Sequence, residues 1–451
     1  MKPARKMHIY NLFPLLAGKF SRWAEHMERA AGMGFNWIFI NPIQQLGPSR
    51  SLYSISDYFS INPAFLDEKS KKSANGQVKD MGEEARGLGL KMMTDLVVNH
   101  CSTGSELLKT HPEWFLWEAK GKVAHPFAFE DGRKVVWKDL AKFDFFYYGE
   151  GEGKGKKNIE KEKDTEALFG FFKSVVENLI DMGFEGFRCD AAYQVPNRFW
   201  ERLIREIKAK HPQVLFLAET LGCPPDQTMK TASAGFDYIF NSSKWWDLKG
   251  HWLIEQYSLT REMAPSISFP ESHDTVRLAE ELGGSVEGMK QRYLFSALFS
   301  AGVMIPMGFE FGLRKRLNVV STTPQDWPTS PWETGIDLRE FIKEVNEIKA
   351  AHSLFAEEAP TAMLPYENPN VLVMWKASAS GSEESLLILN KDIREKQRFQ
   401  TEAVLKFLQS GLPVADISPE YRLDYVPSPF EYDLRPGQGI LLITTREKPK
   451  P

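Results

Sequence analysis

Short apolar runs alternate with amphipathic segments over the first hundred residues of the chain. The mostly apolar runs Met7–Phe13, Trp37–Asn41 and Lys91–Val97 predict strands. Two segments with apolar residues at helical spacing, Ser21–Gly34 and Lys79–Leu88, predict helices between those strands. Strands that alternate with helices in this way indicate a parallel sheet covered by helices.

Two stretches interrupt this alternation. Pro42–Phe65 predicts a long loop after the second strand. From residue 101 to about residue 163 no helix–strand repeat is evident, and aromatic residues are dense in Phe143–Tyr148. Gly149–Lys163 is rich in Gly, Lys and Glu, which is typical of a solvated, mobile loop. We interpret residues 101–163 as an insertion, whose loop is either a flap beside the substrate or a remote surface excursion.

The alternation resumes at Asp164, which predicts a helix N-cap. Helices are expected at Asn197–Lys210 and Gly288–Ala301. Five further apolar runs predict strands: one that ends at Asp190, then Val214–Ala218, Asp237–Phe240, Ser266–Phe269 and Val303–Met307. Eight strands are the number that a (β/α)8 barrel needs.

The pattern changes again after about residue 360. Val371–Trp375, Ser385–Leu389 and Gly439–Thr444 predict strands separated by polar turns, which favours a small antiparallel domain at the C-terminal end.

The composition describes an ordinary globular protein. Of the 451 residues, 42% are hydrophobic and 26% are charged, and the net charge of −4 provides no field for nucleic acid or an anionic membrane. Three cysteines argue against a disulfide framework. No run of 18 apolar residues and no apolar signal core are evident, so we expect a cytoplasmic protein and a substrate available inside the cell.

Acidic residues stand where three of the predicted strands end. They are Asp190 in Gly186–Asp190, Glu219 in Phe216–Thr220 and Asp274 in Glu271–Thr275. The carboxyl ends of barrel strands are where this fold presents its catalytic groups. A fourth segment of the same form, Thr94–His100, precedes them.

Together these four segments resemble the four conserved regions of the α-amylase family of glycoside hydrolases. The resemblance implies an α/β fold: a (β/α)8 TIM barrel over residues 1–100 and 164–360, an inserted small B domain over 101–163, and a C-terminal antiparallel β-sandwich domain over 361–451.

The resemblance also implies roles for the acids. Asp190 matches the nucleophile, Glu219 the general acid/base, and Asp274 the third acid, which binds sugar hydroxyls. Retaining glycoside cleavage needs such a nucleophile and acid/base pair. Arg188 lies two residues before Asp190 on the same strand, so both side chains face the same side, and its cation would keep Asp190 ionised and oriented.

The substrate-binding residues implied by the family are Tyr53, His100, Arg188 and His273. Both histidines match those that hydrogen-bond the sugar at the cleavage point, and Tyr53 stands where a tyrosine stacks on that sugar, although Leu52 replaces the usual Gly or Pro. Asp95 and Asn99 match structural members of the first region.

Some positions depart from the family pattern. Ser272 replaces an Asn, and Tyr193-Gln194 replaces a Lys-His pair whose histidine backbone often helps to bind calcium. We therefore expect no metal and no cofactor, with calcium possible but unsupported. Trp245-Trp246 is open to two interpretations, a sugar platform or core packing.

We expect an intracellular α-amylase-like glycosidase that cleaves α-1,4-glucosidic bonds of maltooligosaccharides or glycogen-type glucans through a covalent glycosyl-enzyme intermediate. An α-glucanotransferase or maltosyltransferase would use the same residues and is the first alternative. A non-catalytic amylase-like binding protein is the second, but it would be expected to lack at least one acid. The expected partner is an α-glucan or maltooligosaccharide, not a nucleic acid or a membrane.

Overall fold

The computed structural model describes residues 6–446 except 119–120, 131–132, 149–158 and 329–332. Eight parallel strands form a closed barrel in the order β1-β16-β15-β14-β13-β12-β5-β2. Their bounds are β1 (Met7–Leu12), β2 (Trp37–Ile40), β5 (Lys91–Leu96), β12 (Gly186–Cys189), β13 (Leu215–Glu219), β14 (Tyr238–Phe240), β15 (Ser266–Ser268) and β16 (Gly302–Pro306). The predicted (β/α)8 TIM barrel is confirmed, and each predicted strand coincides with an observed one within two residues at either end.

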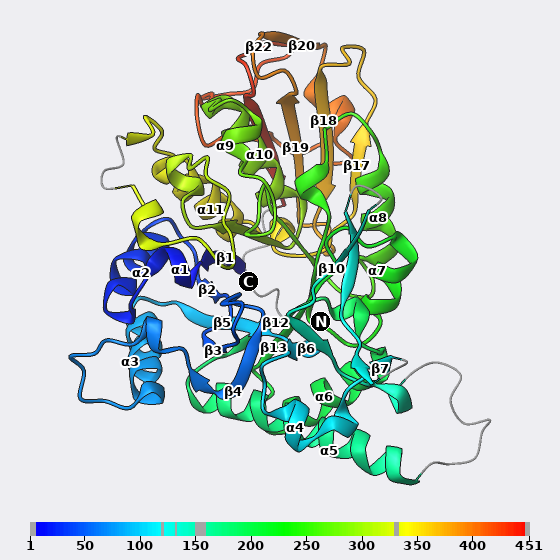
Figure 1. Ribbon diagram of the computed structural model, residues 1–451. Helices are drawn as coiled ribbons and strands as arrows, with labels where there is room; N and C mark the ends of the chain where they lie inside the picture. The colour runs from blue at the N-terminus through cyan, green and yellow to red at the C-terminus, as the bar shows by residue number, and fades with distance from the viewer. Residues whose placement is uncertain (1–5, 119–120, 131–132, 149–158, 329–332, 447–451) are drawn as a thin grey trace.

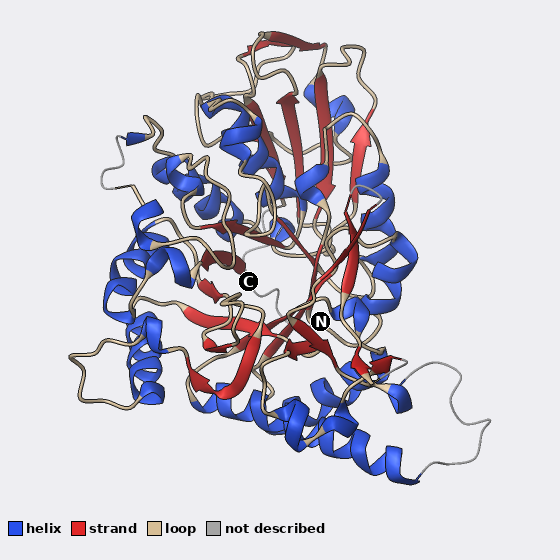
Figure 2. Cartoon of the chain, in the orientation of Figure 1, coloured by secondary structure: helices blue, strands red, loops and turns tan. Residues whose placement is uncertain are grey.

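Helices surround the barrel strands on the outside (Figures 1 and 2). They are α1 (Pro14–Ala17), α2 (Trp23–Gly32), α3 (Ala74–Gly87), α5 (Ile159–Asp181), α6 (Asn197–Lys210), α7 (Pro225–Ala232), α8 (Trp252–Thr260), α9 (Leu278–Glu281), α10 (Val286–Phe299) and α11 (Arg339–Ala351). Strands between two apolar layers explain the uninterrupted apolar runs. In β1, Met7 and Ile9 pack inside the barrel, whereas Tyr10 and Leu12 pack against the helices.

The segment predicted as one loop, Pro42–Phe65, contains an antiparallel hairpin instead. Strands β3 (Gln44–Leu46) and β4 (Ile55–Ile61) pair with two register shifts. The shifts break the period-two alternation that would have indicated strands, so the sequence pattern did not reveal them. The hairpin carries Tyr53 at its tip, toward the carboxyl edge of the barrel.

The insertion follows β5 and consists of short antiparallel strands and a short helix. They are β6 (His100–Ser102), α4 (Leu107–Thr110), β7 (Trp117–Glu118), β8 (Lys122–Val123), β9 (Phe127–Glu130), β10 (Arg133–Val136) and β11 (Leu140–Lys142). Phe143 and Phe145 are buried, with rings against Phe172 of α5 and Phe199 of α6, so much of this aromatic stretch anchors the insertion to the barrel helices.

Helix α5 begins at Ile159, five residues before the predicted N-cap Asp164. The predicted Gly149–Lys163 loop is therefore wrong over residues 159–163, where the chain is helical. Residues 149–158 lie outside the described residues, so the flap hypothesis stays a prediction.

The C-terminal part forms a five-stranded antiparallel sheet in the order β17-β18-β19-β23-β21 and a separate pair, β20-β22. The bounds are β17 (Thr361–Leu364), β18 (Val371–Ala377), β19 (Glu383–Asn390), β20 (Gln397–Thr401), β21 (Ala415–Asp416), β22 (Phe430–Leu434) and β23 (Gly439–Thr445). Phe399 and Phe430 from the pair share a core with Val373 and Ile388 of the sheet. The antiparallel domain is confirmed, whereas the residue boundaries assigned to the three domains stay predictions.

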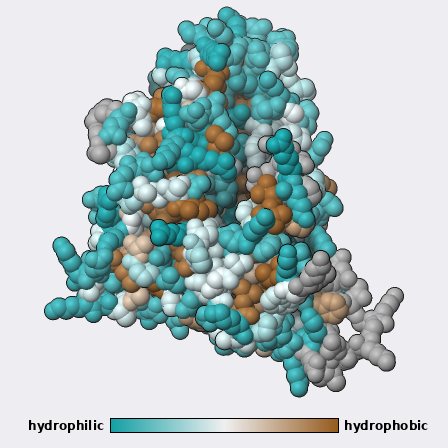
Figure 3. Space-filling model, viewed as in Figure 1, coloured by the Kyte–Doolittle hydropathy of each residue, from teal (hydrophilic) through white to brown (hydrophobic). Residues whose placement is uncertain are grey.

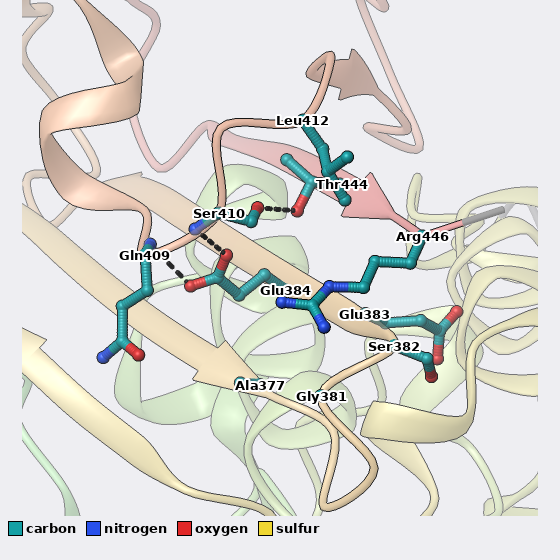
Figure 4. A pocket seen from close by; sticks show the side chains of 10 residues that line it. All are labelled: Ala377, Gly381, Ser382, Glu383, Glu384, Gln409, Ser410, Leu412, Thr444 and Arg446. Carbon is teal, nitrogen blue, oxygen red and sulfur yellow. Dashed lines mark hydrogen bonds between the residues drawn. The ribbon is translucent and has the colours of Figure 1, made fainter.

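A cavity of about 210 Å³ lies at the edge of this sheet, away from the barrel strands. Glu384, which lines it, accepts hydrogen bonds from the backbone amides of Gln409 and Ser410, at 2.7 and 2.8 Å (Figure 4). Its carboxylate thus joins two segments of the domain, which gives this cavity a structural explanation.

In the view of Figure 3, hydrophilic residues dominate the surface of the C-terminal sheets at the top of the molecule. Hydrophobic residues gather lower down, in the middle of the molecule. Within the described part of the chain, no helix combines the length and apolar character needed to cross a membrane.

Candidate active site

Four barrel strands place the predicted site residues at one edge of the barrel. Asp95 of β5 lies opposite Arg188 of β12 in the parallel register, and Glu219 is the last residue of β13. Asp190 follows β12 directly, and Asp274 lies in the segment after β15. Because all eight strands are parallel, these positions share the carboxyl edge.

Arg188 is the buried cation at the centre of this group. Its Nη1 atom donates hydrogen bonds to Oδ1 of Asp95 and to Oδ1 of Asp190, each at 2.8 Å. Its Nη2 atom lies 3.7 Å from Oδ2 of Asp274. One guanidinium, only 5% exposed, thus fixes the directions of two carboxylates and attracts a third.

Glu219 lies beside Asp190 because it accepts a hydrogen bond from the backbone of the residue that follows Asp190. The amide of Ala191 donates to Oε2 of Glu219 and the amide of Leu221 donates to Oε1, both at 3.0 Å. Burial raises the pKa of Glu219 to about 7; Arg188 opposes this, and the nearby Asp190 adds to it. A carboxyl group with that pKa is partly protonated at neutral pH and can act as a general acid.

Tyr53 and His273 form a stacked pair over the same acids. Their ring centroids are 5.9 Å apart with an interplanar angle of 8°. The Tyr53 hydroxyl donates to Oδ2 of Asp95 at 2.8 Å and lies 2.8 Å from Nε2 of His273, which is also 3.1 Å from Oδ2 of Asp274. Burial raises the pKa of Asp95 to about 7, and Arg188 opposes that shift.

Burial lowers the pKa of His273 to about 4, so its imidazole is neutral at pH 7. Since Tyr53 donates its proton to Asp95, the His273 proton belongs on Nε2, between two acceptors. Nδ1 is then an acceptor, and it has no hydrogen-bond partner among the described residues.

His100 is buried, and its main chain is fixed because the Tyr58 hydroxyl donates to its carbonyl at 2.8 Å. Burial lowers the pKa of His100, while the charge of Asp190 and the nearby Tyr53 main chain oppose the change. Within the described part of the chain, neither ring nitrogen makes a hydrogen bond. Two neutral histidines therefore offer unused polar atoms next to the carboxylates.

Two asparagines that the sequence analysis missed complete this side of the site. Asn41 Nδ2 lies 3.0 Å from the Tyr53 hydroxyl and 3.4 Å from Oδ2 of Asp95, and Asn11 Nδ2 donates to Oδ1 of Asn41 at 2.9 Å. Their only sequence signal is a polar residue at the end of each of the first two strands.

Asp274 is the most accessible of the acids, with its side chain 47% exposed. Its amide donates to Oγ of Ser272 at 3.2 Å, so the serine found in place of the family asparagine orients the backbone here. Arg316 donates to the Asp274 carbonyl. In the sequence, this contact is marked only by the basic run 314–316 after the eighth barrel strand, and that run does not indicate which residue it contacts.

Asn99 contacts Gln194 instead of a neighbouring charge. Its Nδ2 atom donates to Oε1 of Gln194 at 3.0 Å, and its Oδ1 atom has no partner among the described residues. In the same part of the chain, no group of three or more His, Cys, Asp or Glu side chains could hold a metal ion. One amide oxygen does not make a calcium site, so the expected lack of a strong calcium requirement stays a prediction.

Sequence comparisons find related glucan enzymes. The family model described as "Glycogen debranching enzyme, glucanotransferase domain" matches residues 3–118. A protein of Burkholderia pseudomallei named alpha-1,4-glucan:maltose-1-phosphate maltosyltransferase is 22% identical over 92% of this chain and 36% of its own length. A protein of the same name from Mycobacterium tuberculosis is 24% identical over 83% of this chain and 55% of its own length. The chain thus spans between about a third and three fifths of the length of such relatives.

Solved structures share the whole fold. A noncanonic maltogenic α-amylase from Thermotoga neapolitana superposes with a TM-score of 0.73 at 19% identity, over 98% of this chain and 99% of the other. An α-amylase from Geobacillus thermoleovorans, solved with acarbose, gives 0.74 at 15% identity over 99% and 100% of the two chains. At this identity the likeness concerns the fold.

Proposed function

Because the chain belongs to the α-amylase family of glycoside hydrolases, we propose that it cleaves α-1,4-glucosidic bonds of maltooligosaccharides or glycogen-type glucans with retention of configuration. The observation that carries this proposal is the cluster of Asp190, Glu219 and Asp274 around the buried Arg188, with the pKa of Glu219 raised to about 7.

In the first step, Asp190 attacks the anomeric carbon and the bond from that carbon to the glycosidic oxygen breaks. Glu219 gives its proton to the departing oxygen, so the leaving sugar departs as a neutral alcohol. The products are a β-glycosyl ester of Asp190 and an ionised Glu219. Arg188 stabilises the negative charge before and after this step. It bonds the Asp190 carboxylate at 2.8 Å before attack, and its positive charge favours the ionised form of Glu219 afterwards.

In the second step, the ionised Glu219 takes a proton from an incoming hydroxyl group. The oxygen of that group displaces Asp190 from the anomeric carbon, and two inversions give net retention. Water as the incoming group gives hydrolysis, and a sugar hydroxyl gives transfer.

The remaining residues bind the sugar in this proposal. The free ring nitrogens of His100 and Nδ1 of His273 contact hydroxyl groups, together with the exposed carboxylate of Asp274. Tyr53 provides a ring beside that sugar and also fixes His273 and Asp95, since its hydroxyl lies 2.8 Å from an atom of each. Asn99 supports the site through Gln194.

Transfer to a second glucan is the other candidate function. The observation in its favour is that similar sequences over most of this chain are named maltosyltransferases, and that the matching family model is a glucanotransferase domain. A non-catalytic binding role has less support, because all three acids lie together.

A product time course on maltoheptaose, alone and with added glucose, maltose or inorganic phosphate, tests the proposal. Only shorter products indicate hydrolysis, products longer than the substrate indicate transfer, and phosphate-dependent cleavage indicates transfer to phosphate. No turnover of maltoheptaose or of a chromogenic maltooligosaccharide would refute the enzymatic function and leave the binding role. Asp190→Asn is the control for contaminating activity.

A further inference from the structure

Two adjacent tryptophans after β14 have opposite environments. Trp246 is buried: its Nε1 donates to the Gly250 carbonyl at 2.9 Å, and its ring centroid lies 4.3 Å from that of Phe295. Trp245 is 52% exposed. The two interpretations of this pair thus apply to different residues, with packing accounting for Trp246 only.

The two residues before Trp245 are anchored. The Ser243 amide donates to Oδ1 of Asn241 at 3.0 Å. The Lys244 ammonium, whose side chain is only 2% exposed, pairs with Oε2 of Glu281 at 2.5 Å. Trp245 thus lies between residues whose positions are fixed by hydrogen bonds, an ion pair and burial, while its own side chain is exposed. An exposed tryptophan gives up the gain from burial, so a rigid one is a candidate to recover that gain on a ligand.

The Trp245 ring lies against the turn that follows Glu219. A Cβ atom added to Gly222 would meet its Cη2 and Cζ3 atoms at 3.4 and 3.6 Å. Gly222 has φ of +76° and donates its amide to Oγ of Ser242 at 3.3 Å. The preceding residue, Leu221, donates its amide to Glu219. The ring and the general acid therefore share one short, hydrogen-bonded turn.

Barrel order places this ring on the leaving-group side. Tyr53 and His100 come from segments next to β2 and β5, and His273 faces Tyr53 in a stack. In the proposed function these groups bind the sugar whose anomeric carbon reacts. The turns after the neighbouring strands β13 and β14 lie on the side of Glu219, which protonates the departing oxygen.

Resting on the proposed function, we propose that Trp245 is the platform for the glucose unit attached to the departing oxygen, and for the acceptor glucan that returns there. The apolar C–H face of a glucose ring stacks on an indole. In the second step the same contact holds an acceptor hydroxyl near the glycosyl ester, so it favours transfer over hydrolysis.

The test compares two donors in Trp245→Ala and Trp245→Phe. Maltoheptaose has a sugar on both sides of the cleaved bond, whereas α-glucosyl fluoride has only fluoride on the leaving side. We expect Trp245→Ala to lower kcat/KM for maltoheptaose roughly tenfold more than for α-glucosyl fluoride, and Trp245→Phe to restore most of the difference. Where wild type forms longer products, their share falls in Trp245→Ala.

Tyr425→Ala, which removes a 74% exposed aromatic ring from the C-terminal part, is the matched control and should leave both values unchanged. Equal losses for both donors in a Trp245→Ala protein with wild-type melting temperature would overturn the inference. A wild-type enzyme that turns over neither donor would overturn the proposed function instead.

Discussion

The raised pKa of Glu219 is the feature of this site with the most measurable consequence. Burial raises it from the ordinary 4.5 to about 7. At pH 7 about half of Glu219 is then protonated, against about 0.3% of a carboxyl group with the ordinary value. The environment thus provides roughly 150-fold more of the acid form that the first step needs.

We predict that kcat/KM for maltoheptaose falls about tenfold per pH unit above about pH 7, because the departing sugar oxygen needs the proton of Glu219. Cleavage of α-glucosyl fluoride should lack this alkaline limb in its first step, since fluoride departs without protonation. Glu219→Gln should slow cleavage of maltoheptaose by a factor of about 100 or more, yet release one rapid equivalent of fluoride from α-glucosyl fluoride as the glycosyl ester accumulates.

The same pKa shift predicts a change in stability. A carboxyl group whose folded pKa is higher than its unfolded pKa stabilises the fold below the unfolded value, and this contribution is lost as pH rises through the folded value. Between about pH 4.5 and pH 7, wild type should therefore lose up to about 3 kcal/mol of unfolding free energy relative to Glu219→Gln. Glu83→Gln, at an exposed position of α3, is the control that should show no such trend.

Denaturant unfolding at pH 5, 6, 7 and 8 measures this difference, and initial fluoride release by rapid mixing measures the chemistry. An alkaline limb of equal pKa for both donors would show that Glu219 does not protonate the leaving group. A stability difference that stays constant with pH would show that burial does not shift its pKa.

Three further predictions concern other residues of the protein. Asp190→Asn should lower turnover by about a thousandfold or more with an unchanged circular dichroism spectrum, and near-wild-type activity in a sequence-verified sample would remove the nucleophile assignment. A chelator should change neither activity nor melting temperature strongly, because Asn99 contacts Gln194 instead of a cluster of acids; a large loss that calcium reverses would contradict this. Lys349→Met should lower the unfolding free energy by about 3 kcal/mol or more, because Nζ of Lys349 donates to the buried carbonyls of Ala297 and Ser300 at 2.8 and 2.7 Å; a loss no larger than that of exposed Lys79→Met would contradict it.

The barrel could be predicted from the sequence because each of its strands lies between two apolar layers. Such strands read as uninterrupted apolar runs, and the acids follow them at fixed positions. The β3–β4 hairpin could not be predicted, since its register shifts and half-exposed residues leave no regular period. Helix α7 is short and polar, and the strands of the β20-β22 pair are half polar, so neither left a clear signal.

The candidate site divides in the same way. Asp190, Glu219 and Asp274 were recognisable because each stands beside its strand in the sequence. The contacts of Asn41 and Ala191 depend instead on which strands are neighbours and on a left-handed backbone, with φ of 43° at Ala191. Such contacts join residues 28 or 54 positions apart, so no local pattern contains them.

The two sides of this site differ in chemistry, and that difference affects whether the enzyme favours hydrolysis or transfer. On the side of the reacting sugar, Asp95, His273 and Tyr53 are fixed by hydrogen bonds of 2.8 Å, which suits one rigid sugar with defined hydroxyl positions. On the side of the leaving group, the described part of the chain offers an exposed ring, Trp245, that contacts any glucose by its apolar face. Water gains nothing from such a ring, whereas an acceptor glucan does. The choice between the two reactions should therefore depend on acceptor concentration and on Trp245, with the acids common to both.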